Sequence, residues 1–193
     1  MIPLARPNVN TVEYWDRRYR DEVEVMWRIW TTGDLIAKIA RHIPKNAYVL
    51  DAGCGAGIVP ARIAEIRPDI RWSACDFSPE SVAYLRRLSA VKFQKVFVAN
   101  LELPIRIPSG SYDVVLCTEV LEHLSRPSLA VEEIVRIARQ KVIVSVPHGS
   151  CIDSHEHIWR YTRSGIAKLL ANHGTVSIET ARNDRNLIGV LCK

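Results

Sequence analysis

Apolar residues along the chain form short blocks that alternate between strand-like and helix-like spacing. Runs of the length and character of buried strands lie at residues 47–51, 71–75, 95–99, 112–118 and 141–146. Segments with apolar residues at helical spacing separate them, at 58–66, from Ser78 onward, and at 127–139. Strands that alternate with helices in this way predict an α/β fold built on a parallel sheet.

The carboxyl-terminal quarter of the chain extends this pattern. Thr162 can cap a helix that Gly174 ends. Two segments of alternating polarity follow, at 175–181 and 187–192, with turn residues between them. We therefore expect seven strands, mostly parallel with one antiparallel strand, and helices on both faces of the sheet.

The first 46 residues have a different pattern from the rest. Residues 11–42 have helical spacing and predict two helices that break near residues 31–34, whereas residues 1–10 show no periodicity and are expected to be mobile. We predict a single domain over residues 1–193, with a helical cap at 1–46 and the sheet-containing core at 47–193. Five aromatic residues of this cap could form a lid over a ligand or could simply pack on the core: Tyr14, Trp15, Tyr19, Trp27 and Trp30.

A glycine-rich turn follows the first core strand. The strand ends at Asp51, glycines stand at 53, 55 and 57, and a helix begins at Ile58. Glycine lets a ligand lie against the backbone, and the helix N-terminus offers free N–H groups. The spacing G-x-G-x-G differs from the dinucleotide fingerprint G-x-G-x-x-G, and no Gly-Lys-Ser/Thr follows. An acid at the strand end suits a cationic or hydroxyl-bearing ligand better than a pyrophosphate.

Three motifs resemble one enzyme family, the class I S-adenosylmethionine-dependent methyltransferases. The run D-A-G-C-G-A-G at 51–57 resembles motif I of that family, and Y-W-D-R-R-Y at 14–19 resembles its Y-W-D-x-R-Y segment. Residues 112–123 resemble its F-D-V-V-x-x-x-x-V-L-E-H motif. The resemblance spans roughly residues 14–146 and implies a Rossmann-like fold, S-adenosylmethionine as cofactor, and in-line methyl transfer to an oxygen or nitrogen acceptor.

The resemblance also implies which residues bind the cofactor. Asp76 ends the second core strand, where an acid can accept hydrogen bonds from a ribose diol, and Phe77 could lie against the adenine. Asn100 stands where the family usually has Asp, and its carbonyl can still accept from the adenine amino group. The full predicted set is Asp51, Gly53, Cys54, Gly55, Gly57, Asp76, Phe77, Asn100, Leu101, Thr118 and Glu119.

Histidines supply the candidate catalytic groups. His123 follows the fourth core strand, and His148, His155 and His157 follow the fifth, so both segments reach the same edge of the sheet. Imidazole can take a proton from an acceptor near neutral pH. We predict catalytic roles for His123, His155 and His157. The alternatives are that His123 anchors a turn and that the loop histidines are exposed.

Two acids near His123 raise the question of a metal. Glu119, Glu122 and His123, joined by His155 or His157, would suit a divalent cation. This set resembles the E-x-x-E-H plus H-x-x-H arrangement of small-RNA 3′-terminal 2′-O-methyltransferases, but the second pair here is spaced H-x-H, and E-x-x-E-H recurs in metal-free relatives. We therefore assign no metal ligand and keep a metal-assisted RNA 2′-O-methyltransferase as an alternative.

Composition narrows the partners. The chain of 193 residues is 48% hydrophobic and 24% charged with a net charge of +5, so a nucleic-acid partner is compatible but not required. No apolar run reaches membrane-spanning length, and five scattered cysteines without a C-x-x-C pair favour reduced thiols in a cytoplasmic protein. We expect a small-molecule acceptor. The other readings are a nicotinamide oxidoreductase, disfavoured by the absence of Tyr-x-x-x-Lys, and a cofactor-binding module without turnover.

Overall fold

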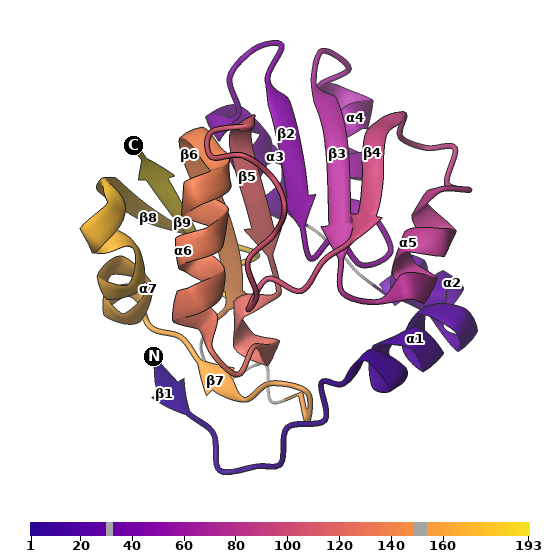
Figure 1. Cartoon of the computed structure of the whole chain (residues 1–193). Coiled ribbons are helices and arrows are strands. Elements are labelled where there is room, and N and C mark those ends of the chain that lie inside the picture. The colour runs from indigo at the N-terminus through magenta and orange to yellow at the C-terminus, as the bar shows by residue number, and fades with distance from the viewer. Residues whose placement is uncertain (30–32, 149–153) are drawn as a thin grey trace.

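The computed structural model describes residues 1–29, 33–148 and 154–193 and is built around a seven-stranded sheet (Figure 1). The strand order is β4-β3-β2-β5-β6-β9-β8. β9 runs antiparallel to both of its neighbours, and the other pairs are parallel. The strands are β2 (Tyr48–Ala52), β3 (Arg71–Asp76), β4 (Phe93–Val98), β5 (Tyr112–Thr118), β6 (Ala138–Pro147), β8 (Thr175–Ala181) and β9 (Asn186–Cys192). The predicted α/β fold, with one antiparallel strand, is confirmed.

Helices cover both faces of this sheet. α6 (Pro127–Ile137) and α7 (Arg163–Leu170) pack on one face, and α3 (Leu35–His42), α4 (Ile58–Ile66) and α5 (Pro79–Leu85) pack on the other. Neighbouring residues of a central strand therefore enter different cores: Val114 packs with α3 and α4, whereas Val115 packs with α6. Burial on both faces explains why the strands read as unbroken apolar runs.

Local capping chemistry sets where several helices begin. The Ser78 hydroxyl accepts a hydrogen bond from the Ser81 N–H at 3.2 Å, with Pro79 in the first turn of α5. The Thr162 hydroxyl caps α7 through the Gly165 N–H at 3.1 Å. The end of α6 differs from the expectation. The backbone turns extended at Ala138 and pairs with Tyr112, so β6 begins where the sequence predicted that the helix would continue to Arg139.

The N-terminal residues correct a second expectation. Residues 1–10 were expected to be mobile, but Ile2–Pro3 form the short strand β1, which pairs with β7 (Trp159–Arg160). The Leu4 N–H donates to the carbonyl of Ile158 at 3.0 Å. This partner lies about 150 residues away along the chain, so no local periodicity could reveal the pairing. The N-terminal segment crosses below the carboxyl ends of the strands (Figure 1).

The helical cap has one more break than the sequence predicted. α1 (Val12–Asp21) ends with Glu22 as its C-cap residue, and α2 (Val23–Ile29) begins directly after this residue. Together with α3 this gives three helices in the described part of the cap rather than two. Residues 33 and 34 of the predicted break at 31–34 form a turn directly before α3, whereas residues 31 and 32 and the aromatic residue Trp30 lie outside the described residues.

The sheet topology creates a crevice where the strand order changes direction. β2 is followed along the chain by β3 on one side, whereas β5 pairs with its other side. In open α/β sheets, ligands bind at this switch point, outside the carboxyl ends of the strands. The glycine turn (residues 53–57), η1 (Leu121–His123) and the segment before β7 (residues 154–158) all lie at this edge. Across the described residues, no helix has the length and apolarity that crossing a bilayer requires.

Candidate active site

The glycine turn between β2 and α4 is held against the end of β3. The N–H groups of Gly53 and Cys54 donate to the Cys75 carbonyl at 2.8 and 3.1 Å. Gly53 and Gly55 have φ angles of +79° and +50°, and a Cβ at Gly55 would lie 2.8 Å from the Tyr19 hydroxyl. Glycine accommodates both the left-handed backbone and the close approach of α1. Both the conformation of the turn and the contact with α1 therefore require glycine at position 55.

Asp76 ties this turn to α5. One carboxylate oxygen accepts from the Gly55 N–H at 2.9 Å, and the other accepts from the Ser78 N–H at 3.0 Å. Burial raises the pKa of Asp76 to about 6, although the backbone hydrogen bonds favour its charged form. Besides the predicted role toward a ribose, Asp76 thus organises the wall of the crevice.

A cavity of about 140 Å³ lies next to Asp76 at the carboxyl edge of the sheet. Trp15 and Tyr19 of α1 and His123 of η1 also border it. Its wall contains more than half of the residues predicted to bind the cofactor, namely Gly53, Asp76, Phe77, Asn100, Leu101 and Glu119. Residues from four separate segments thus meet where the sequence placed the adenosine.

A second, larger cavity of about 530 Å³ adjoins the first. The two share the wall residues Trp15, Tyr19, Gly53, Glu119 and His123. They therefore form one crevice along the glycine turn. The second cavity adds Cys54, Gly55, Thr118, Glu122, His157 and three arginines, Arg18, Arg182 and Arg185.

Buried acids surround this crevice. Asp51 lies beneath the glycine turn with 1% of its surface exposed, and neither of its carboxylate oxygens has a hydrogen-bond partner among the described residues. Burial, and next the charge of Asp76, raises the pKa of Asp51 to about 7. Unpaired buried carboxylates are costly, and a cationic ligand would relieve that cost.

Glu119 is held more firmly than Asp51. One of its carboxylate oxygens accepts from the Ser145 hydroxyl and from the Asn186 amide, both at 2.8 Å. Burial raises its pKa, and these bonds oppose the rise. The residue has a φ of +55°, a left-handed conformation uncommon outside glycine. Such strain clusters at functional sites because the surrounding structure must maintain it.

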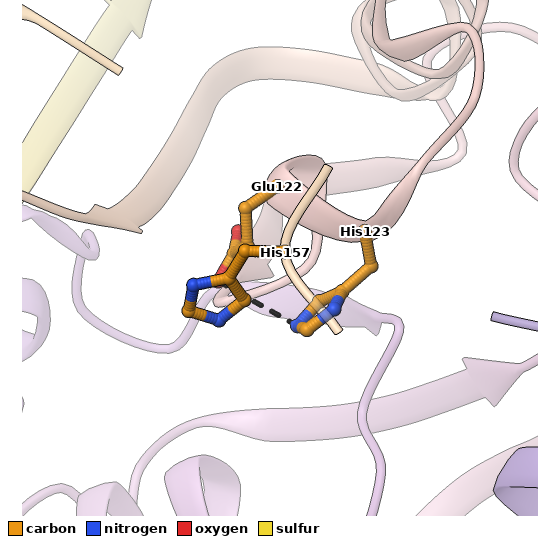
Figure 2. A group of neighbouring side chains, drawn as sticks. All are labelled: Glu122, His123 and His157. Atoms are coloured by element: carbon orange, nitrogen blue, oxygen red, sulfur yellow. Dashed lines mark ion pairs between the residues drawn. The ribbon is translucent and has the colours of Figure 1, made fainter. Parts of the chain in front are cut away.

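Glu122, His123 and His157 converge at the border of the second cavity. Figure 2 shows their side chains turned toward one another, two from η1 and one from the segment before β7. One donor atom from each lies within 4.8 Å of the others, and His123 Nε2 is 3.8 Å from Glu122 Oε1. Burial, and next the neighbouring His157, lowers the pKa of His123 to about 4. His123 is therefore neutral at physiological pH and is a weak base.

Other predicted residues fall outside the cavity walls. The exposed His155 has its Nε2 atom 3.0 Å from the Tyr14 hydroxyl and does not border either cavity as the described residues define them. His148 lies with Nδ1 3.4 Å from the Tyr161 carbonyl, also away from both walls. Gly57 starts α4, where an added Cβ would meet Leu85 at 2.4 Å. Of the three predicted catalytic histidines, the fold thus brings His123 and His157 together.

The sequence did not single out Glu156, which joins the cap to the loop before β7. The Tyr14 hydroxyl donates to Glu156 Oε1 at 2.6 Å, and Arg18 forms an ion pair with the same oxygen. Burial acts to raise the pKa of Glu156, but the Tyr14 hydrogen bond and the Arg18 charge outweigh it, and the pKa is lowered. The Y-W-D-R-R-Y motif had drawn attention to Tyr14 and Arg18. No motif surrounds Glu156, about 140 residues away, so the sequence did not predict that it contacts them.

The fold and crevice define an α/β nucleotide-binding domain whose acid-lined site, at the switch point of the sheet, suits a cationic ligand. Residues 50–146 match the family model described as "Methyltransferase domain". The chain belongs to this family of S-adenosylmethionine-dependent methyltransferases, and the resemblance that the motifs carried is confirmed.

Individual relatives match parts of the chain. The chain is 35% identical to the Ubiquinone biosynthesis O-methyltransferase of Xanthomonas axonopodis pv. citri (strain 306) over 91 residues. These residues cover 46% of this chain and 37% of that protein. The chain is 29% identical over 136 residues to the tRNA N(3)-cytidine methyltransferase METTL6 of Homo sapiens, covering 65% and 48%. The matches thus span less than half of these curated relatives.

Solved structures show the same fold. A methyltransferase in complex with the Haloferax volcanii Trm112 methyltransferase activator superposes with a TM-score of 0.73 at 18% identity, covering 92% of this chain and 96% of that one.

S-adenosylmethionine, the family's cofactor, fits the residues present. It carries an ammonium and a sulfonium. Asp76 and Glu119 border the crevice, whereas the unpartnered carboxylate of Asp51 lies beneath the glycine turn and borders neither cavity as the described residues define them. The glycine turn leaves the backbone free of side chains on that side. Which of these residues contacts which part of the cofactor remains a prediction.

Proposed function

We propose that this chain transfers the methyl group of S-adenosylmethionine to an oxygen or nitrogen atom of a small-molecule acceptor. The observation that carries the proposal is the continuity of the two cavities. The first is bordered by predicted cofactor residues, and the second by His123 and His157. The acceptor would lie in the second cavity, beside the methyl group.

When bound, S-adenosylmethionine supplies an electrophilic methyl group on a sulfonium leaving group. The chain would contribute binding and orientation, which can lower a barrier by ~7–11 kcal/mol. Asp76 and Asn100 would hold the ribose and adenine, with Phe77 against the ring. Trp15 and Tyr19, which border both cavities, would exclude water from the reacting atoms.

The shape of the second cavity supports a small acceptor. Its volume of about 530 Å³ lies within the usual range for small-molecule sites, roughly 300–1,000 Å³. α1 and the segment before β7 wall it on the outside. The match to an O-methyltransferase of ubiquinone biosynthesis supports an oxygen acceptor. Buried free thiols at Cys54, Cys75 and Cys117 support the expected cytoplasmic setting.

Calorimetry and a labelled-methyl screen test this function. The full chain should bind S-adenosylmethionine and S-adenosylhomocysteine but not NADH. With methyl-labelled cofactor it should label one class among phenols, amines and carboxylates. Label in tRNA instead would favour the nucleic-acid alternative that METTL6 suggests. Tight cofactor binding without label in any class would make the chain a binding module.

A further inference from the structure

We propose that Glu122, His123 and His157 form a binding site for a divalent transition-metal ion at the wall of the second cavity (Figure 2). The inference rests on the proposed function, because the ion would lie where the acceptor is expected. It gives the two histidines the role of ligands, where the sequence had predicted catalytic bases, assigned no metal ligand and kept a metal-assisted site as an alternative.

Glu122 is the first observation behind this site. Its side chain is 1% exposed, and neither carboxylate oxygen has a hydrogen-bond partner among the described residues. Buried polar side chains almost always find partners, and a bare buried carboxylate requires a proton or a cation.

The orientation of His123 is the second observation. Its Nδ1 atom lies 3.2 Å from the backbone carbonyl of Glu156. A carbonyl can only accept, so Nδ1 carries the proton and donates. The other nitrogen, Nε2, then has a free lone pair, and it is the atom 3.8 Å from Glu122 Oε1. A ring nitrogen that donates to a backbone carbonyl while the other faces the ion is the usual arrangement of metal-bound histidine.

His157 completes the set from a different part of the chain. The Ile158 N–H donates to the Glu122 carbonyl at 2.9 Å, which fixes this segment against η1. The His157 and His123 rings are 5.0 Å apart between centroids. Metal–ligand bonds of about 2.0–2.2 Å place adjacent donors roughly 3–3.5 Å apart. The three donors lie within 4.8 Å of one another, so the widest pair would close by up to roughly 1.3–1.8 Å around an ion.

The ligand types indicate which ions fit. Two imidazoles and one carboxylate suit zinc, manganese, iron or cobalt, whereas magnesium and calcium prefer oxygen ligands alone. Three protein ligands leave coordination positions open toward the cavity, as in catalytic sites. An acceptor hydroxyl bound there would lose its proton to water more readily. Its oxygen would then form the O–C bond as the C–S bond breaks, leaving S-adenosylhomocysteine as the neutral thioether.

Metal binding to the untagged full chain tests the proposal. After removal of metals with EDTA and dialysis, titration with Zn²⁺ and with Co²⁺ should show one ion per chain by calorimetry. Co²⁺ should also develop a visible absorption band of a histidine-containing site. The isosteric Glu122→Gln and the His157→Gln variants should each weaken binding at least about tenfold. The matched controls Glu132→Gln and His173→Gln, away from the cluster, should bind as the unaltered chain does.

The outcomes separate this proposal from the proposed function. Circular dichroism and thermal melting confirm that each variant is folded. A chain that binds no ion, or whose variants bind as tightly as the controls, overturns the metal site and leaves a protonated Glu122. S-adenosylmethionine binding and methyl transfer are measured on the same metal-free sample. Binding of an ion without binding of S-adenosylmethionine would support the metal site and contradict the proposed methyl transfer.

Discussion

At the scale of single residues, the crevice is distinguished by carboxylates held away from water without the usual partners. Asp51 and Glu122 both have oxygens without a hydrogen-bond partner among the described residues, and they come from different elements, β2 and η1. Each costs stability in the unliganded chain. A cationic ligand would offset that cost, so the same residues that weaken the fold would strengthen binding.

Asp51 allows this cost to be measured through its pH dependence. Its pKa is about 7 in the folded chain, above the ordinary value of 3.8, so between these values the folded state keeps a proton that the unfolded state releases. Stability from this group is therefore lost as pH rises toward 7. Asp51→Asn should gain about 1–3 kcal/mol over the unaltered chain between pH 5 and pH 8. Urea unfolding at both pH values measures the difference.

A matched variant keeps that result interpretable. Asp184 is exposed on the turn between β8 and β9, and Asp184→Asn removes the same charge without burial. If both variants gain the same free energy of unfolding, the gain comes from the change in net charge and not from removing the buried carboxylate. Because Asp51 is also a predicted cofactor residue, Asp51→Asn should bind S-adenosylmethionine more weakly even where it is more stable.

Asp76 tests the cofactor assignment. Asp76→Ala should weaken S-adenosylmethionine binding by ~1–3 kcal/mol through lost charge-assisted hydrogen bonds. The structure adds a loss of stability, because Gly55 and Ser78 each donate a backbone hydrogen bond to this carboxylate. Asp76→Asn keeps an acceptor and should lose less stability. Calorimetry showing unchanged affinity for both variants would rule out the ribose role.

At the scale of secondary-structure elements, α1 is the part of the cap that shapes the site. It places Trp15 and Tyr19 in the walls of both cavities. Asp16 accepts hydrogen bonds from the Ser78 hydroxyl and from the Glu80 N–H, which ties α1 to the start of α5. No residue of α1 is fully buried, so the helix covers the core without being part of it.

Deleting residues 1–20 should therefore leave a folded core with weaker cofactor binding. The deletion removes β1 and most of α1, and with them part of both cavity walls. We expect at least a tenfold loss of affinity, which corresponds to about 1.4 kcal/mol. Deleting residues 1–5 alone removes β1 and should change affinity much less. Equal affinity of the longer deletion and the intact chain would show that α1 is ordinary packing rather than a lid.

The sequence predicted those features that local chemistry determines. The apolar runs predicted the strands, and the capping residues Ser78 and Thr162 predicted where two helices begin. The glycine turn predicted the position of the crevice. What it missed depends on contacts between distant segments. The pairing of β1 with β7 and the hydrogen bond of Tyr14 to Glu156 join residues more than 140 positions apart. The pKa of His123 was missed for the same reason, since burial in the folded site lowers it.

At the scale of the whole molecule, a rigid sheet carries a site assembled from separate surface segments. The central strands are buried on both faces, whereas α1, η1 and the segment before β7 meet only at the carboxyl edge (Figure 1). Side-chain hydrogen bonds and one ion pair join α1 to the segment before β7, with Glu156 at their centre. Segments joined in this way are expected to open and close together.

Hydrogen exchange can show this coupling directly. Saturating S-adenosylmethionine should slow amide exchange in residues 12–21 and in residues 154–160 by similar factors, because the cofactor would contact the first segment and Glu156 links it to the second. The loop at residues 106–111, at the opposite edge of the sheet, is the internal control and should change little. In Glu156→Gln, which removes the charge that Arg18 pairs with, protection should still rise at 12–21 but much less at 154–160. Equal protection of both segments in the variant would show that the cofactor orders each segment by itself, and that the Glu156 contacts do not transmit closure across the site.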